Sequence, residues 1–190
     1  MIIKNKRFLL PIFIVSFLVL SSCKKDTTAT EAATTPATTA AFTASSTAFT
    51  NNGTFPKLYT CDSTGISPKL SWANAPVGTA SYAITMHHIP PSPPNHVYML
   101  LYNIPVTTTA IADAVSGIGI FGKNTVNDLQ SYTPPCSQGP GAKHYSITVY
   151  ALSAAPVFIV PASQVTMDIF LAAISTKTLA TSIINITYTR

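Results

Sequence analysis

Histidine is the residue type in this chain that is best suited to metal binding or acid–base chemistry. His87 and His88 end one predicted strand, His96 begins the next, and His144 enters a third. Clustered imidazoles can hold a transition metal. Adjacent residues of a strand point to opposite faces, so at most one of His87 and His88 can face a site shared with the others. The spacing favours ordinary strand-end histidines, and we expect no metal site.

The motifs that usually carry catalysis or bind a cofactor are absent from the sequence. It contains no Gly-rich phosphate loop, no G-x-S-x-G elbow, no H-E-x-x-H and no C-x-x-C. The acidic residues after position 41 are far apart in the sequence: Asp62, Asp113, Asp128 and Asp168. A hydrolase that needs paired carboxylates has little to use here. We expect no enzyme activity, no catalytic residues and no cofactor.

Cys61 and Cys136 form an even pair in the C-terminal part of the chain. In an exported domain such a pair can form a disulfide. It would close a loop of about 75 residues, with a nominal value of ~4 kcal/mol in the chain-entropy model. Two buried free thiols are the alternative, because Cys packs well as a small apolar group. The sequence leaves both interpretations open.

The segments around these side chains have the patterns of strands, which predicts a β-rich domain. Residues 81–88 and 145–152 alternate apolar and polar positions, and residues 179–188 are rich in β-branched side chains. Residues 97–104 are almost wholly apolar, which is typical of a strand covered on both faces. One helix is expected near the C-terminus, capped by Thr166 or Ser163. Its apolar positions have the i, i+3, i+4, i+7 spacing: Met167, Phe170, Leu171 and Ile174.

The net charge does not indicate a nucleic-acid partner. The formal net charge is +5, but Lys4, Lys6 and Arg7 contribute to it within the first seven residues. After position 41, six basic and four acidic residues remain, a net charge of +2. A nucleic-acid-binding domain needs clustered Lys and Arg. We therefore expect no nucleic-acid binding.

The N-terminal segment 1–22 has the pattern of a signal peptide. A basic start is followed by an apolar run at 8–20, which is too short to span a bilayer as a helix. Leu20-Ser21-Ser22-Cys23 resembles the lipobox of bacterial lipoproteins, which implies lipidation of Cys23 and anchoring in the membrane. The alternative is an ordinary signal peptide or an uncleaved anchor with an incidental Cys. We expect an exported protein, lipid-anchored to the bacterial cell envelope at the outer membrane.

Residues 23–41 are expected to form a linker after the lipidated Cys. Positions 24–41 are dominated by Thr and Ala and hold no large apolar side chain, so ordering them would cost entropy that burial cannot offset. As a flexible coil this segment would reach roughly 25 Å. The folded domain is expected at 42–190.

Several motifs in residues 42–190 resemble one family. The most specific part is Y-T-C-D at 59–62 followed by I-S-P-x-L-x-W at 66–72. Further matches are L-Y-N-I-P at 101–105 and Y-T-P-P-C at 132–136. Together these motifs resemble the phosphatidylethanolamine-binding protein family, in its bacterial Raf kinase inhibitor-like branch. The resemblance implies a mostly β fold, a two-sheet β-sandwich with one or two short helices.

Members of this family carry a small pocket for phosphate-like groups, and the resemblance implies one here with altered residues. The family's D-P-D-A-P segment falls on positions 88–92, starting at His88, and its strand-opening His falls on Tyr98. The Gly-Pro of its loop falls on Pro134-Pro135, and its H-R-Y falls on 143–145. Only two positions keep the family residue. The expected ligand-binding residues are His88, Tyr98, Pro134, Pro135, Lys143 and Tyr145.

The altered residues change the expected chemistry of the pocket. Loss of the family's Asp removes a negative charge that can accept from an ammonium group, whereas Lys143 supplies a point charge for phosphate. We expect a lipid-anchored binding module for a small anionic or phosphorylated group. The alternative is an inhibitor or docking protein for an envelope protein, such as a protease, with a degenerate pocket. The run 90–94, P-P-S-P-P, is expected to be a stiff lip beside the pocket.

Overall fold

The computed structural model describes residues 40–88, 90 and 94–190, which fall in one compact unit. The expected signal peptide, Cys23 and most of the linker lie outside the described residues. Among the residues described, no helix is long and apolar enough to cross a membrane.

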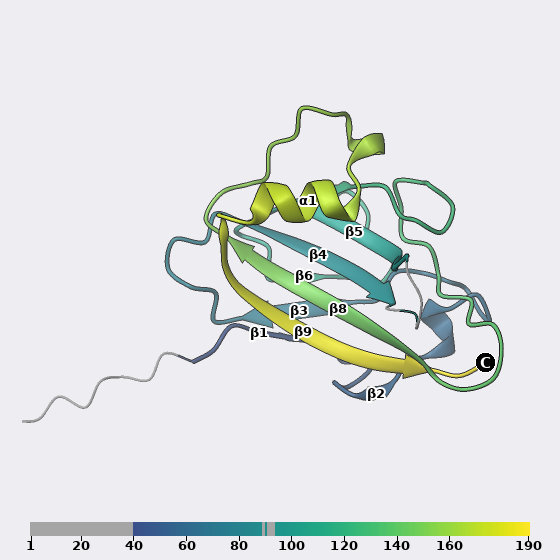
Figure 1. The fold of residues 1–190 in the computed structure, drawn as a ribbon. Coiled ribbons are helices and arrows are strands. Elements are labelled where there is room, and N and C mark those ends of the chain that lie inside the picture. The colour runs from purple at the N-terminus through teal and green to yellow at the C-terminus, as the bar shows by residue number, and fades with distance from the viewer. Residues whose placement is uncertain (1–39, 89, 91–93) are drawn as a thin grey trace, which may run out of the picture. The chain divides into compact units, whose positions relative to one another are not determined.

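The described residues form strands, two 3-10 helices and one α-helix (Figure 1). In chain order these are β1 (Thr43–Ser45), β2 (Gly53–Thr54), η1 (Lys57–Tyr59), β3 (Leu70–Ala73), β4 (Ser81–His88), β5 (His96–Pro105), β6 (Ala110–Ile111), β7 (Ile120–Phe121), β8 (Lys143–Leu152), η2 (Ala162–Gln164), α1 (Met167–Ile174) and β9 (Thr178–Tyr188). The four strands and the helix predicted from the sequence are confirmed, with bounds that differ by at most two residues.

The strands form two sheets, which confirms the predicted two-sheet fold. The larger sheet has the order β2-β9-β8-β4-β5-β7, and the smaller has the order β1-β3-β6. Pairing in the larger sheet is antiparallel except between β2 and β9. The smaller sheet lies on one face of the larger, and α1 lies on the other (Figure 1).

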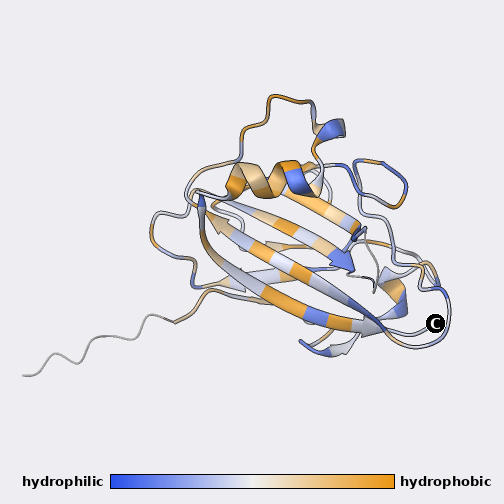
Figure 2. Cartoon of the chain, viewed as in Figure 1, coloured by the Kyte–Doolittle hydropathy of each residue, from blue (hydrophilic) through white to orange (hydrophobic). Residues whose placement is uncertain are grey.

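The main core lies between the two sheets. Every second residue of β4, including Ile84 and Met86, points into it, and Trp72 of β3 reaches it from the smaller sheet. Figure 2 shows hydrophobic residues recurring along β4, β5, β8 and β9. Burying a side chain of the size of Ile or Met stabilises the fold by about 1.5–3 kcal/mol, so this face fixes the register of the central strands.

A second core lies under α1 on the opposite face of the larger sheet. Phe170 is fully buried there and packs against Tyr102 of β5 and Tyr150 of β8. The Thr166 side chain accepts a hydrogen bond from the Ile169 N–H and caps the helix, as expected from the sequence. Because β5 is covered on both faces, its sequence is an almost continuous apolar run.

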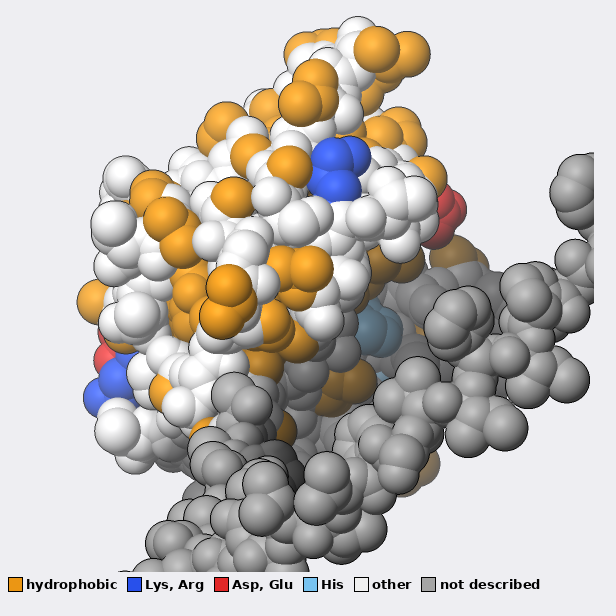
Figure 3. Space-filling view, turned by 90° about the vertical axis from the view of Figure 1, so that its left-hand side faces the viewer, with side chains coloured by type: hydrophobic (Ala, Val, Ile, Leu, Met, Phe, Trp, Pro, Cys, Tyr) orange, Lys and Arg blue, Asp and Glu red, His pale blue; other side chains and the backbone are white. Residues whose placement is uncertain are grey.

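The register of the larger sheet gives it two distinct ends. At one end Ser81 pairs with Pro105 and Leu152, and Leu152 pairs with Thr178. Loops meet there, and we call it the loop end; Figure 3 looks onto it. At the other end, seven residues along β4, His88 pairs with both neighbouring strands.

The Y-T-C-D segment at 59–62 contacts parts of the chain that are distant from it in the sequence. The Tyr59 hydroxyl, which is buried, donates to Asp113 Oδ1 at 2.9 Å. Cys61 is bonded to Cys136 with 5.2 Å between the Cα atoms. Asp62 accepts a hydrogen bond from the Tyr188 hydroxyl and forms an ion pair with Arg190 at 2.8 Å. The segment therefore ties residues 136 and 188–190 to the body of the domain.

Removing the disulfide should lower the stability of the domain. The bridge closes a loop of 75 residues, so the Cys61→Ser, Cys136→Ser double variant should lose about 4 kcal/mol of unfolding free energy in the chain-entropy model. Urea unfolding followed by circular dichroism measures this loss. An unchanged midpoint in the double variant would show that the bridge does not constrain the chain, and the parent protein under reducing conditions is the matched control.

Candidate functional site

A cavity of about 260 Å³ opens at the end of the larger sheet opposite the loop end. Strands β4, β5 and β8 supply most of its wall, and residues 136–138 close one side. Its described lining is His88, Pro90, His96, Tyr98, Cys136, Ser137, Gln138, Lys143 and Tyr145. A neighbouring hollow of about 350 Å³ shares four of these residues, so the cavity opens towards Thr125 and Val126.

Strand register places the aromatic side chains of this pocket in one row. His88 pairs with His96 on one side and with Tyr145 on the other. Their ring centroids lie 5.9 Å and 5.4 Å from that of His88. Paired residues of neighbouring strands point to the same face, so the row follows from the register that the core imposes.

A bulge in β5 adds Tyr98 to the row. The pairing steps from His87 with Val97 to Met86 with Met99, so Tyr98 has no partner on β4. A bulge of this kind turns a side chain away from the alternation of its strand. Tyr98 consequently points to the same face as Met99 and meets Tyr145 edge-to-face, with ring centroids 5.5 Å apart.

The wall formed by residues 136–138 is positioned by hydrogen bonds rather than by a strand. Asn124 is fully buried, and its amide nitrogen donates to the Leu129 carbonyl and to Thr133 Oγ1. The Thr133 N–H donates to the Tyr98 carbonyl at 2.9 Å. With the disulfide at Cys136, these bonds hold the wall beside Tyr98.

Lys143 is the one formally charged residue of the described lining. Within residues 40–88, 90 and 94–190 it forms no ion pair with a carboxylate. No acidic residue lines the cavity in the described part of the chain. The cavity therefore presents an unneutralised positive charge.

Hydroxyl groups add hydrogen-bond donors. Burial raises the pKa of Tyr98 and of Tyr145, and the adjacent Tyr98 raises that of Tyr145 further. Both phenols therefore remain protonated at neutral pH. Ser137 is buried, and its hydroxyl has no hydrogen-bond partner among the described residues. A buried hydroxyl without a partner is costly, so it favours a ligand or solvent partner.

The surroundings of His88 lower its pKa and favour the neutral form. Burial lowers its pKa, and the nearby charges of His96, Lys143, His144 and His87 lower it further, in that order. A neutral imidazole can accept one hydrogen bond and donate another, whereas a bound anion would favour the protonated form.

Four of the six expected ligand-binding residues meet in this cavity: His88, Tyr98, Lys143 and Tyr145. Pro134 and Pro135 lie outside the lining; the Pro135 carbonyl accepts a hydrogen bond from the Cys61 N–H. The residues that follow them form the wall instead. Motif matching did not identify His96, Ser137 or Gln138.

The structure also bears on the expectations for His87, for the run 90–94 and for metal binding. His87 points to the opposite face from His88, as the strand alternation predicts, and lines a hollow of about 540 Å³ with Asp168 near α1. Pro90 lines the cavity, but residues 91–93 of the expected lip lie outside the described residues. Within the described part of the chain, no three His, Cys, Asp or Glu side chains are grouped to hold a metal ion.

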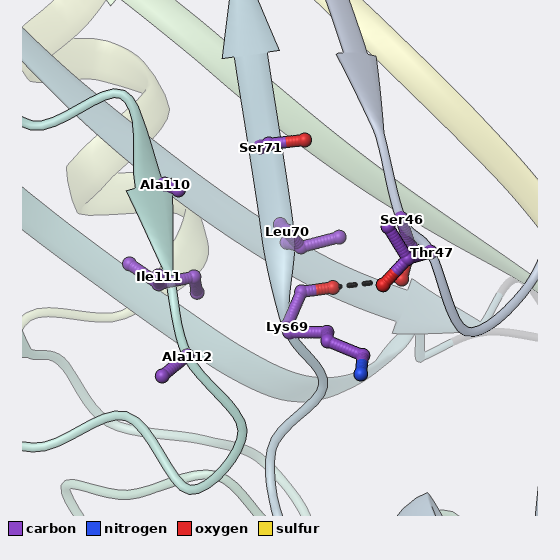
Figure 4. A pocket seen from close by; sticks show the side chains of 8 residues that line it. All are labelled: Ser46, Thr47, Lys69, Leu70, Ser71, Ala110, Ile111 and Ala112. Atoms are coloured by element: carbon purple, nitrogen blue, oxygen red, sulfur yellow. Dashed lines mark hydrogen bonds between the residues drawn. The ribbon is translucent and has the colours of Figure 1, made fainter.

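Another hollow, of about 310 Å³, lies on the smaller sheet (Figure 4). Ser46 Oγ donates there to the Lys69 carbonyl at 2.8 Å. The Lys69 ammonium lies 3.7 Å from an Asp113 carboxylate oxygen, so its charge is already neutralised. Apart from Lys69, this hollow is lined by small or apolar side chains, and it offers less for recognition of a charged ligand than the cavity with Lys143.

Comparison with known proteins identifies the family. The family model described as phosphatidylethanolamine-binding protein matches residues 45–189. The chain belongs to the phosphatidylethanolamine-binding protein family. A relative from Aquifex aeolicus, named a UPF0098 protein, is 32% identical over 126 residues, 62% of this chain and 71% of its own length. A UPF0098 protein from Chlamydia muridarum is 31% identical over 148 residues, 74% of this chain and 94% of its own.

Solved structures show the same fold. The crystal structure of a phosphatidylethanolamine-binding protein homologue from Chlamydia trachomatis has a TM-score of 0.71 and 26% identity, covering 79% of this chain and 98% of that one. The structure of YbcL from Escherichia coli, described as a member of the mammalian family, has a TM-score of 0.70 at 21% identity, covering 80% of this chain and 99% of that one. The latter similarity concerns the fold alone.

The lowered pKa values of His87 and His88 predict that acid destabilises the domain. Burial lowers both below the ordinary 6.5. The unfolded chain then binds more protons than the folded chain just below that pH, so the unfolding free energy falls as pH decreases from 7.5 to 5.5. Urea unfolding at both pH values measures this. In the His87→Gln, His88→Gln double variant, the fall in unfolding free energy between pH 7.5 and 5.5 should be at most half of the fall in the parent. An equal fall in parent and variant would refute the assignment of this pH dependence to the two histidines.

Proposed function

We propose that this chain is a lipid-anchored binding module of the bacterial envelope whose cavity holds a small anionic or phosphorylated group. The observation that carries the proposal is the charge of the lining: one unpaired cation, Lys143, and no carboxylate among the described lining residues. Family membership supports a binding role, because the family is named for binding phosphatidylethanolamine.

The proposed contacts follow from donor chemistry. An ammonium group is a strong point-charge partner for phosphate oxygens. The hydroxyls of Tyr98, Tyr145 and Ser137 are donors, and the raised pKa of the two tyrosines keeps them protonated. A phosphate monoester has three terminal oxygens that accept hydrogen bonds. One ammonium group and two or three hydroxyls are enough to give each of these oxygens a donor.

The lining also indicates what this site does not select. His88 occupies a position where the family motif has Asp, so the described cavity lacks a carboxylate to accept from an ammonium head group. We propose that the anionic part of the ligand is recognised and that an attached amine contributes little.

The anchor is supported by sequence alone. The basic start, the apolar run at 8–20 and the small residues before Cys23 are the features that carry it. Several acyl chains on one residue bind a membrane firmly, whereas one chain binds only marginally. The anchored form would be exported and held at the outer membrane.

Removing the Lys143 charge should weaken binding of inorganic phosphate to the full chain. Loss of a hydrogen bond to a charged group costs about 1.5–3 kcal/mol, so Lys143→Ala should weaken affinity roughly 10- to 100-fold. Tyr98→Phe removes one neutral donor and should weaken it roughly 3- to 10-fold. Isothermal titration calorimetry measures both effects.

The matched control for this titration is Lys177→Ala, because Lys177 follows α1 at the loop end, away from the cavity. It should leave the affinity unchanged. Equal affinity in Lys143→Ala and the parent would contradict the proposed role of Lys143. An absence of saturable binding in the parent would contradict the proposed function itself.

Selectivity gives a separate test. Ethyl phosphate and phosphoethanolamine differ by one ammonium group. We expect their affinities for the parent to agree within about threefold, because an exposed ion pair with that group would change the affinity by no more than about this factor. His88→Asp should restore a preference for phosphoethanolamine, because the new carboxylate can accept from the amine. A strong preference for phosphoethanolamine in the parent would show that another group binds the amine.

A further inference from the structure

The loop end of the larger sheet carries little charge. It is formed by residues 74–80, 105–109, 153–161 and 175–177, all of which the structure describes. Lys177 is the only charged residue in these four segments. Charged residues are found instead towards the other end, where Lys143, Asp62 and Arg190 lie.

Large apolar side chains are exposed on the same loops. Val77 and Ile159 are fully exposed, at 101% and 104% of the reference area, and Val157 is 81% exposed. Val106 and Leu179 add partly exposed apolar surface. Figure 3 looks onto this end and shows hydrophobic side chains spread across it and over the projection above it. Several strongly exposed apolar side chains at one end of a domain, with little charge between them, favour an interaction surface there.

The loops are held in place from beneath, so their tips are presented outward. Phe158 packs on Tyr102 with ring centroids 4.9 Å apart, and Val157 and Ile159 flank it on the exposed side. Gly78, next to Val77, has a φ of 89°, which favours glycine at that turn, and lies close to the Leu179 side chain. The exposed tips are therefore features of ordered loops.

The chain also enters the domain at this end. Thr43 pairs with Ala73, the last residue before the 74–80 loop. The Asn74 side-chain amide donates to the Ala41 carbonyl at 3.3 Å, and Phe42 stacks on Tyr82. Residues 1–39, which contain the apolar run at 8–20 and Cys23, are therefore joined to the domain beside the exposed loops.

We propose that the loop end rests on the lipid bilayer that holds the N-terminus, with the tips of the 74–80 and 153–161 loops inserted at the headgroup level. This inference rests on the anchor in the proposed function. The predicted linker reaches roughly 25 Å as a coil, about the length of β4 at 3.3 Å per residue, so it keeps the end to which it is joined close to the membrane, and the apolar tips set the orientation. Apolar tips without acidic neighbours suit the interface of a bilayer.

This orientation limits which ligands can reach the cavity. The cavity lies at the opposite end of β4, at His88, so it faces away from the bilayer that holds the chain. A headgroup of that bilayer cannot reach it. The ligand is then a phosphorylated or anionic group presented from the opposite side, free in solution or on another surface.

Depth-dependent fluorescence quenching tests the proposal on the full chain. The chain is reconstituted in vesicles of phosphatidylethanolamine and phosphatidylglycerol, with or without brominated acyl chains, which quench nearby tryptophan. The sole native tryptophan, Trp72, is 4% exposed and gives a constant background. Val77→Trp and Ile159→Trp report on the loop end. Leu129→Trp, at an exposed apolar residue of the 122–135 segment beside Val97, is the matched control.

We expect brominated lipid to reduce the added emission of Val77→Trp and Ile159→Trp at least twofold, and to leave that of Leu129→Trp unchanged. Equal quenching at all three positions, or none, would overturn the proposal. A doubled mass in analytical ultracentrifugation with no quenching would assign the loops to a second copy of the chain instead. Failure of the chain to float with vesicles would overturn both the anchor and this inference, whereas phosphate titration of the same sample tests the cavity independently.

Discussion

The position of β4 between β5 and β8 is the constraint on which the rest of the structure depends. Its residues are buried on both faces, by the smaller sheet on one side and by α1 on the other. A slip of one residue would exchange the two faces, so the register is strongly fixed. That register places His88 between His96 and Tyr145 at one end and collects four loops beside Ser81 at the other. The candidate pocket and the apolar surface are both consequences of it.

The motifs that carry the family resemblance have structural roles here. Tyr59 binds Asp113, Cys61 is bonded to Cys136, and Asp62 holds Tyr188 and Arg190. These contacts fix the wall of the pocket without lining most of it. Three of the departures expected from the family pattern, at His88, Tyr98 and Lys143, fall on the lining, whereas Pro134 lies outside it. Family membership therefore predicts the fold of this chain better than it predicts the ligand.

The sequence predicted the strands and the helix because their patterns are local. The alternation over 81–88 marks the side chains that point into the main core, although β4 is buried on both faces, and the spacing of α1 marks Phe170 and Ile174, which are buried. It predicted four pocket residues by matching motifs, but it could not place residues 136–138. Their position depends on Asn124, on Thr133 and on a bridge to Cys61, all distant in the sequence. The bulge at Tyr98 is similarly invisible, because the pattern of 97–104 is apolar at almost every position.

Amide chemical-shift mapping is the most direct test of whether the cavity beside His88, Tyr98 and Lys143 binds an anion. Two-dimensional NMR spectra of the full chain in micelles would be recorded while inorganic phosphate is added. We expect saturable shifts confined to the amides of β4, β5 and β8 near His88, Tyr98 and Lys143 and to residues 136–138, and we expect these shifts to be lost in Lys143→Ala. Shifts scattered over the surface without saturation, or saturable shifts centred on the hollow beside Lys69, would contradict it.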